Sequence, residues 1–148
     1  MARTTPGQLT AARVAWDAWR VTRGGLPALA ARQVTRLDAL VAHARSRSRF
    51  YSEHYRDAPA MTPELHQLPT VSKPQLMARF DDWVTDPRVT RSAVEPFVSD
   101  LDNLGRDFLG RYVIFTTSGS TGTPALPVQD PRAIAVMTGL AYGRTMAW

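Results

Sequence analysis

The segment Thr116–Thr123 constrains this chain more than any other, because it holds six hydroxyl side chains and two glycines but no charged or bulky residue. Such a segment cannot build a hydrophobic core. Its backbone N–H groups and hydroxyls are suited instead to binding several anionic oxygens. The apolar, β-branched and aromatic run Tyr112–Phe115 precedes it and predicts a strand at residues 111–116.

The residues after this loop predict a hairpin followed by a helix. Ala125–Gln129 is short enough to be a returning strand, which makes residues 116–124 the tip of the hairpin. Asp130-Pro131 then opens a last helix. We expect four of its side chains to face inward: Ile134, Met137, Leu140 and Ala141.

Residues 1–108 read as a mostly helical N-terminal segment. A helix opening at Pro6 and stopped by Gly24-Gly25 places Trp16 and Trp19 on one face. We expect that face to pack on a neighbouring element rather than on a membrane interface. The predicted fold class is therefore α/β with an α+β appearance, in which helices lead into the hairpin.

Three more helices are expected before the strand. An amphipathic helix runs from Leu26-Pro27 to about Ser46, and its end is followed by the aromatic anchor Phe50-Tyr51. The sequence Ser72–Gln75 is typical of a capping box, and it opens a helix that continues through Trp83. Thr90 is expected to cap the third.

The charge of the chain is concentrated in its first part. Its 148 residues carry a net charge of +5, and residues 1–60 hold ten arginines against four acidic residues. An Arg-rich helical protein that binds an acidic partner or nucleic acid is therefore an alternative function. Nucleic acid is the less expected partner, because the arginines are dispersed and Arg45–Tyr51 reads better as a helix end.

Other catalytic classes find little support. The chain has no cysteine, which excludes disulfides, thiolate catalysis and cysteine-bound zinc. His43, His54 and His66 do not have metal-like spacing, so no metal site is expected. Asp81-Asp82 reads as a solvated acidic patch, because adjacent helical residues diverge by about 100°.

The loop differs from two common nucleotide-binding motifs. A P-loop requires G-x-x-x-x-G-K-[ST], but Thr123 follows Gly122 and no lysine is present there. The dinucleotide fingerprint G-x-G-x-x-G fails as well. The string that remains, Thr117–Pro124, reads T-S-G-S-T-G-T-P.

At these residues the chain resembles the adenylate-forming superfamily, and in particular its phenylacetate–CoA ligase branch. The stretches His43–Tyr51, Leu68–Lys73 and Phe80–Asp86 carry the upstream part of the resemblance. Many relatives in the wider superfamily have lysine after the loop proline, where this chain has Ala125. The resemblance implies that a carboxylate, ATP and CoA, with Mg²⁺, yield acyl-CoA, AMP and pyrophosphate.

The resemblance also implies which residues bind the ATP phosphates: Thr117, Ser118, Gly119, Ser120, Thr121, Gly122 and Thr123. Family enzymes are about three times as long, so residues 109–148 are expected to be only the start of the adenylate-forming core. The chain is then an N-terminal fragment, a single partial domain that contains no catalytic residue and is inactive alone. We expect a cytoplasmic protein that binds no membrane, with a nucleotide and a small carboxylic acid as partners of the full-length enzyme.

Overall fold

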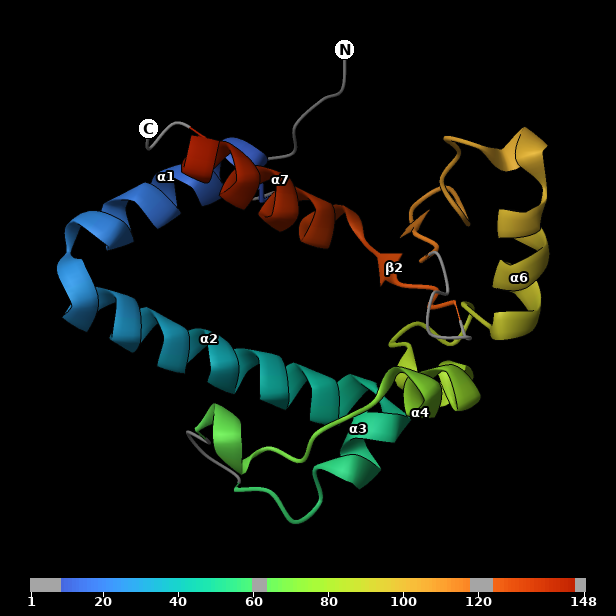
Figure 1. Ribbon diagram of the computed structural model, residues 1–148, viewed down its shortest axis with the longest axis horizontal. Helices are drawn as coiled ribbons and strands as arrows, with labels where there is room; N and C mark the ends of the chain where they lie inside the picture. Colours follow the sequence, from blue (N-terminus) through green and yellow to red (C-terminus); the bar gives the residue numbers. More distant parts are fainter. Residues whose placement is uncertain (1–8, 60–63, 118–123, 146–148) are drawn as a thin grey trace.

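The computed structural model describes residues 9–59, 64–117 and 124–145. The chain there is mostly helical and contains a two-stranded antiparallel sheet, which confirms the coarse prediction of helices leading into a hairpin and a helix (Figure 1). None of the helices in these ranges combines the length and apolar composition needed to cross a membrane. In chain order the elements are α1 (Ala11–Arg23), α2 (Gly25–Arg47), α3 (Arg49–His54), η1 (Leu65–Gln67), α4 (Lys73–Ala78), α5 (Phe80–Trp83), α6 (Arg91–Ser99), η2 (Leu101–Asn103), β1 (Val113–Ile114), β2 (Val128–Gln129) and α7 (Pro131–Thr145).

Helix α1 begins later than the sequence predicts. Thr10 has an extended backbone, and its hydroxyl accepts a hydrogen bond from the backbone N–H of Arg13. This side chain satisfies a free donor of the first turn, so the predicted opening at Pro6 is wrong. The predicted stop is confirmed, because α1 ends at Arg23 and Gly25 has a φ of 72°.

Helix α7 lies against α1, although the two helices are far apart in the sequence (Figure 1). Gly139 is the buried residue of α7, and the half-buried Ala135 and Val136 share its face. The predicted inward face was wrong for Met137 and Leu140, which are 52% and 37% exposed, and for Ala141, which is exposed too. The small residues permit a closer approach of the helices than the larger ones would.

The tryptophan pair of α1 faces solvent. Trp16 and Trp19 are 63% and 43% exposed, and their rings stack with centroids 4.8 Å apart. Arg23 lies over the Trp19 ring at 4.3 Å. The prediction that a neighbouring element covers these indoles is wrong, because α7 covers the opposite side of α1, where Val14 is buried.

Helix α2 is joined to α1 by a cluster of charges. Asp17 of α1 accepts hydrogen bonds from Arg32 and Arg36 of α2, and it lies 3.7 Å from Arg20. Much of the predicted apolar stripe of α2 is exposed, and Val41, near its end, is its buried residue. Polar contacts therefore hold the first part of α2 against α1.

The end of α2 and the start of α3 confirm the predicted aromatic anchor. Phe50 is 4% exposed. The buried Ser48 caps α3 through Tyr51 and donates a hydrogen bond to the carbonyl of Asp82. Arg45 donates to two backbone carbonyls after α3. These arginine and aromatic groups serve the fold here, as the sequence interpretation predicted.

Helices α4 and α6 begin at the predicted caps, but the helix that was predicted to continue from α4 through Trp83 is shorter than expected. Ser72 and Gln75 form the expected capping box. The predicted helix through Trp83 is divided at Arg79, whose φ of −121° and ψ of 40° lie outside helical values. Its guanidinium forms salt bridges with Glu53 of α3 and Asp82 of α5. Thr90 caps α6, as predicted.

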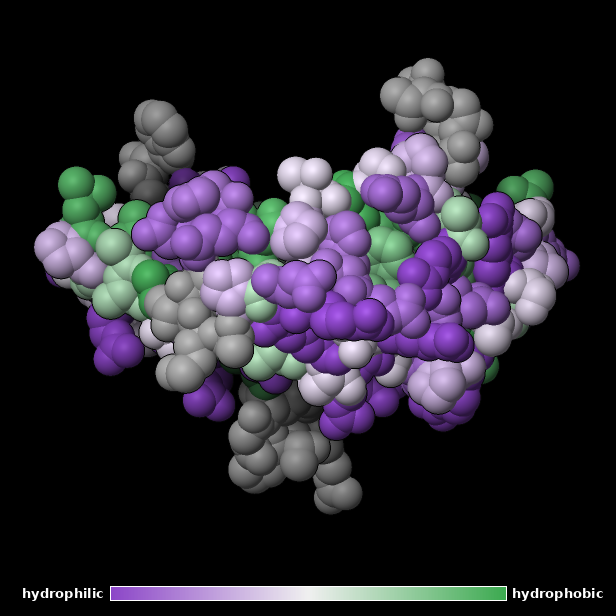
Figure 2. Space-filling model, turned by 90° about the horizontal axis from the view of Figure 1, so that it is seen from below, coloured by the Kyte–Doolittle hydropathy of each residue, from purple (hydrophilic) through white to green (hydrophobic). Residues whose placement is uncertain are grey.

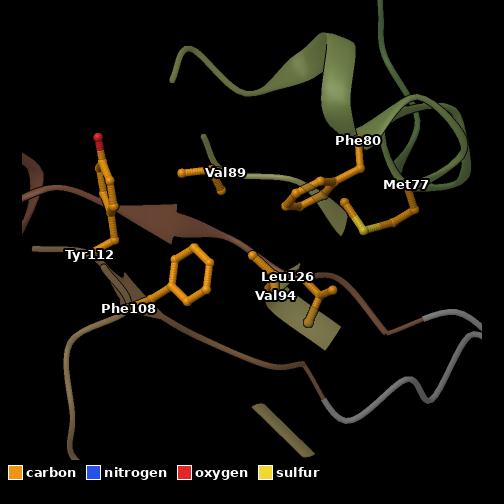
Figure 3. Packing of buried hydrophobic residues seen from close by; sticks show 7 residues of the cluster. All are labelled: Met77, Phe80, Val89, Val94, Phe108, Tyr112 and Leu126. Carbon is orange, nitrogen blue, oxygen red and sulfur yellow. The ribbon is translucent and has the colours of Figure 1, made fainter. Parts of the chain in front are cut away.

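The hydrophobic core lies between α4, α5, α6 and the hairpin. Seven buried residues form it: Met77, Phe80, Val89, Val94, Phe108, Tyr112 and Leu126 (Figure 3). Val94 is completely buried, and Phe80 is 2% exposed. Leu126 lies in the segment that leads into β2 and belongs to this core. The core therefore fixes the end of the loop between the strands.

Candidate functional site

The loop that the sequence singles out connects the two short strands. β1 and β2 pair in antiparallel register with Ile114 opposite Val128. The N–H of Phe115 donates to the carbonyl of Pro127 at 3.1 Å, which continues the pairing toward the loop. Six of the predicted binding residues lie outside the residues that the structure describes: Ser118, Gly119, Ser120, Thr121, Gly122 and Thr123.

Thr117 lies at the base of this loop and is held to Ala125 by two hydrogen bonds. Its backbone N–H donates to the carbonyl of Ala125 at 3.2 Å. Its hydroxyl accepts from the N–H of Ala125 at 2.9 Å. These two hydrogen bonds make Thr117 close the loop at its base.

Core side chains anchor both arms of the hairpin. Tyr112 precedes β1 and is 8% exposed, and Leu126 precedes β2 and is 7% exposed. Both belong to the cluster that includes Phe80 and Val94 (Figure 3). Burying side chains of this size stabilises their positions by about 1.5–3 kcal/mol each. The loop therefore starts and ends on backbone that the core fixes.

The hydroxyl of Tyr112 continues this anchor into a charged group. It donates a 2.6 Å hydrogen bond to Asp86, which also accepts from the guanidinium of Arg88 at 2.7 Å. The hydrogen bonds from Arg88 and Tyr112 lower the pKa of Asp86. The hydrogen bond to Asp86, followed by burial, raises the pKa of Tyr112. Asp86 therefore stays ionised as a fixed acceptor for the strand.

The predicted first strand is shorter than expected, because a tight turn precedes it. Phe108 and Tyr112 exchange two backbone hydrogen bonds of 2.8 and 2.9 Å. Between them Leu109 and Gly110 have φ values of 52° and 64°. A left-handed backbone is rare for a residue as bulky as leucine. Arg111 belongs to this turn, so the prediction of a strand from residue 111 is wrong.

Asp81 and Asp82 do not form a pair for acid–base chemistry. Asp81 accepts a hydrogen bond from the backbone N–H of Arg91 at 2.6 Å. Asp82 accepts from Arg79 at 2.7 Å and lies 3.7 Å from Arg49. Each carboxylate has its own cationic or N–H partner, so both stabilise the joints between helices.

The histidines also have separate partners. The Nε2 atom of His54 lies 3.1 Å from the carbonyl of Thr70, and His66 lies 3.2 Å from Glu64. In the parts of the chain that the structure describes, no group of three His, Asp or Glu side chains is arranged to hold a metal ion.

The structure adds features that the sequence interpretation missed. The run of hydroxyl residues did not indicate that the Thr117 hydroxyl accepts a hydrogen bond from the backbone N–H of Ala125. Asp86 and Tyr112 are far apart in the sequence, and no local pattern links them. No family model, curated protein or solved structure matches this chain.

Proposed function

We propose that this chain is the N-terminal part of an ATP-dependent acyl-adenylate-forming ligase of the phenylacetate–CoA ligase type. In this reaction a carboxylate oxygen attacks the α-phosphorus of ATP and pyrophosphate leaves. The thiol of CoA then displaces AMP from the acyl-adenylate. The loop Thr117–Thr123 holds the β- and γ-phosphates in the first step.

The observation that carries this proposal is the string T-S-G-S-T-G-T-P between two antiparallel strands. Hydroxyls and backbone N–H groups are donors suited to phosphate oxygens, and glycine lets the backbone approach a ligand closely. The two hydrogen bonds between Thr117 and Ala125 support the proposal, since they bring the ends of the string together. A closed loop base preorganises such donors before ATP binds.

Negative charge develops on the β- and γ-phosphates as pyrophosphate leaves. Donors positioned beforehand stabilise this charge at little reorganisation cost. The hydroxyls of Ser118, Ser120, Thr121 and Thr123 fill this role in the proposal. Mg²⁺ bound to ATP supplies further neutralisation, and the described residues offer no separate cage for it. The adenine, the carboxylate and CoA require contacts beyond this loop.

The alternative is an Arg-rich helical binding protein for an acidic partner or nucleic acid, and nucleic acid receives the less support from the described contacts. Arg32 and Arg36 bind Asp17, and Arg79 binds Glu53 and Asp82. Other arginines also have carboxylate partners nearby: Arg20, Arg49, Arg88 and Arg91. These ion pairs neutralise much of the charge that a phosphate backbone would need.

A binding experiment with inorganic pyrophosphate and Mg²⁺ tests the loop. Phosphorus NMR of the full chain should show pyrophosphate signals that shift on addition of protein. We expect Gly119→Ala combined with Thr121→Val to weaken binding at least tenfold. Thr121→Val removes a hydroxyl donor, and the β-carbon added at residue 119 hinders the approach of phosphate to the backbone N–H. Thr35→Val on α2 removes a hydroxyl elsewhere and serves as the matched control.

The same two substitutions in a full-length ligase test the reaction by carboxylate-dependent pyrophosphate exchange. The proposal predicts a strong loss of exchange with unchanged circular dichroism. Unchanged exchange and unchanged pyrophosphate binding would show that the loop has another role. Exchange activity in residues 1–148 alone would contradict the proposal that the chain is only the N-terminal part of the ligase and is inactive alone.

A further inference from the structure

An open hollow on α1 combines arginines with an exposed indole. It has a volume of about 440 Å³ and is lined by Ala12, Arg13, Trp16, Asp17 and Arg20. Trp16 is 63% exposed and stacks on Trp19, so the two rings offer a preformed apolar surface. We refer to these five lining residues as the basic hollow. It is large enough for one or two side chains of a partner.

The basic hollow carries an excess of positive charge. Asp17 is its acidic residue, and it already binds Arg32 and Arg36. Arg13 makes no salt bridge with any residue that the structure describes. The cluster therefore has more donors than its own carboxylate satisfies, which favours a partner with carboxylates.

The complementary surface is present in the same chain, between α6 and the hairpin. Leu101 and Leu104 are 84% and 87% exposed, and they are the most exposed large apolar residues described. Asp102 and Asp107 beside them are exposed as well. No arginine in the described ranges forms a salt bridge with these two carboxylates. We refer to residues 100–107 as the acidic leucine segment.

The two surfaces cannot meet within one molecule. The acidic leucine segment follows α6 at one end of the long axis, whereas α1 lies toward the other end (Figure 1). The view from below shows hydrophobic groups at both ends of this axis, and others between them among hydrophilic residues (Figure 2). Each end is therefore free to bind a different molecule.

We propose that a second copy of this chain binds here, its acidic leucine segment entering the basic hollow of the first copy. The leucines would cover the exposed indoles, and Asp102 and Asp107 would face Arg13 and Arg20. Because the two patches differ, the contact is head-to-tail and leads to short chains or a closed ring. This proposal is independent of the ligase function.

A second copy fits the hollow better than a flat anionic membrane does. The surface is concave, whereas a lipid headgroup layer is flat and carries no apolar side chain to place against Trp16. Aspartates beside leucines can pair with the arginines while the leucines contact Trp16. The acidic leucine segment supplies that combination, and every molecule brings one copy of it.

Sedimentation velocity of the full chain over a range of concentrations tests the proposal. We expect self-association that weakens when salt rises from 50 to 500 mM, since the Debye length falls from roughly 14 Å to roughly 4 Å and exposed charges are screened. Arg13→Gln with Arg20→Gln, or Asp102→Asn with Asp107→Asn, should each lower the association constant about tenfold. Arg47→Gln with Arg56→Gln removes the same charge elsewhere and should change it little.

Mixing the two defective variants gives the sharpest outcome. The arginine variant retains the acidic leucine segment, and the aspartate variant retains the basic hollow. A 1:1 mixture should therefore form a heterodimer that does not grow further. A monomer at all concentrations, or self-association that the variants leave unchanged, would overturn the proposal. Binding to anionic vesicles without self-association would overturn it too, and would assign the hollow to a membrane surface.

Discussion

Replacing Gly139 by alanine tests how closely α1 and α7 pack. A β-carbon at Gly139 would lie 2.5 Å from the carbonyl oxygen of Ala11 and 2.6 Å from the β-carbon of Val14. Neither atom is the end of a flexible side chain, so one helix must move. Gly143 lies one turn later, where a β-carbon would be 3.9 Å from Ala15. Gly143→Ala is therefore a matched control.

The two substitutions should change the stability of the α1–α7 contact in opposite directions. Alanine stabilises a helix interior by up to about 1 kcal/mol relative to glycine, and this gain applies at both positions. At Gly139 the forced separation costs about 1–3 kcal/mol, as overpacking does elsewhere, and it exposes the buried Val14. We expect Gly139→Ala to destabilise the docking of α1 by up to about 2 kcal/mol once the helix gain is subtracted, and Gly143→Ala to stabilise it by about 0.5–1 kcal/mol.

Amide hydrogen exchange measured by mass spectrometry resolves these effects along the chain. In Gly139→Ala the amides of α1 and α7 should exchange about tenfold faster, since 1.4 kcal/mol corresponds to a factor of about ten. The amides of α6 should be unaffected, because Val94 belongs to a different buried cluster. Gly143→Ala should slow exchange in α1 slightly.

Two results would refute this reasoning. Equal exchange in the two alanine variants would show that α1 and α7 do not approach closely at Gly139. Faster exchange in α6 by the same factor as in α1 would show that the helix pair and the core open together as one unit.

Three further predictions concern the core and the hairpin. Val94→Ala should lower the free energy of unfolding by about 2 kcal/mol in a urea titration, whereas Val34→Ala, at a 46% exposed position, should cost little; similar losses would contradict the described core. Asp86 has a lowered pKa in the folded chain, so its contribution to stability is present above its unfolded pKa of about 4 and is lost as pH falls. Asp86→Asn should therefore flatten the acid side of the pH–stability profile, and an unchanged profile would exclude this group as the cause. Thr117→Val should raise the exchange rate of the Ala125 amide while Thr117→Ser preserves it, and equal rates would exclude the hydroxyl contact.

Much of the local structure could be predicted from the sequence, because local chemistry decides it. The hydroxyl and glutamine of Ser72–Gln75 and the cap at Thr90 act within one helical turn, and both predictions are confirmed. The glycines after α1 act locally as well. The exposure of Trp16 could not be predicted, because an amphipathic pattern does not say whether a neighbouring element is present.

The partners of each helix depend on contacts between distant residues. Periodicity favoured Met137 and Leu140 for the inward face of α7, but Gly139 is the buried residue, since a close approach favours the smallest side chain. At the candidate site, the hairpin was predictable from composition. The turn at Leu109 was not, because leucine gives no signal for a left-handed backbone.

The contact between α1 and α7 has a consequence for the order of folding. Nearly the whole described chain separates Val14 from Gly139, and closing a loop of that length costs roughly 4 kcal/mol in chain entropy. The core between Met77 and Leu126 closes much shorter loops. It can form first and bring the two distant helices within reach. During synthesis the apolar residues of α1 that contact α7 then stay uncovered until α7 has left the ribosome.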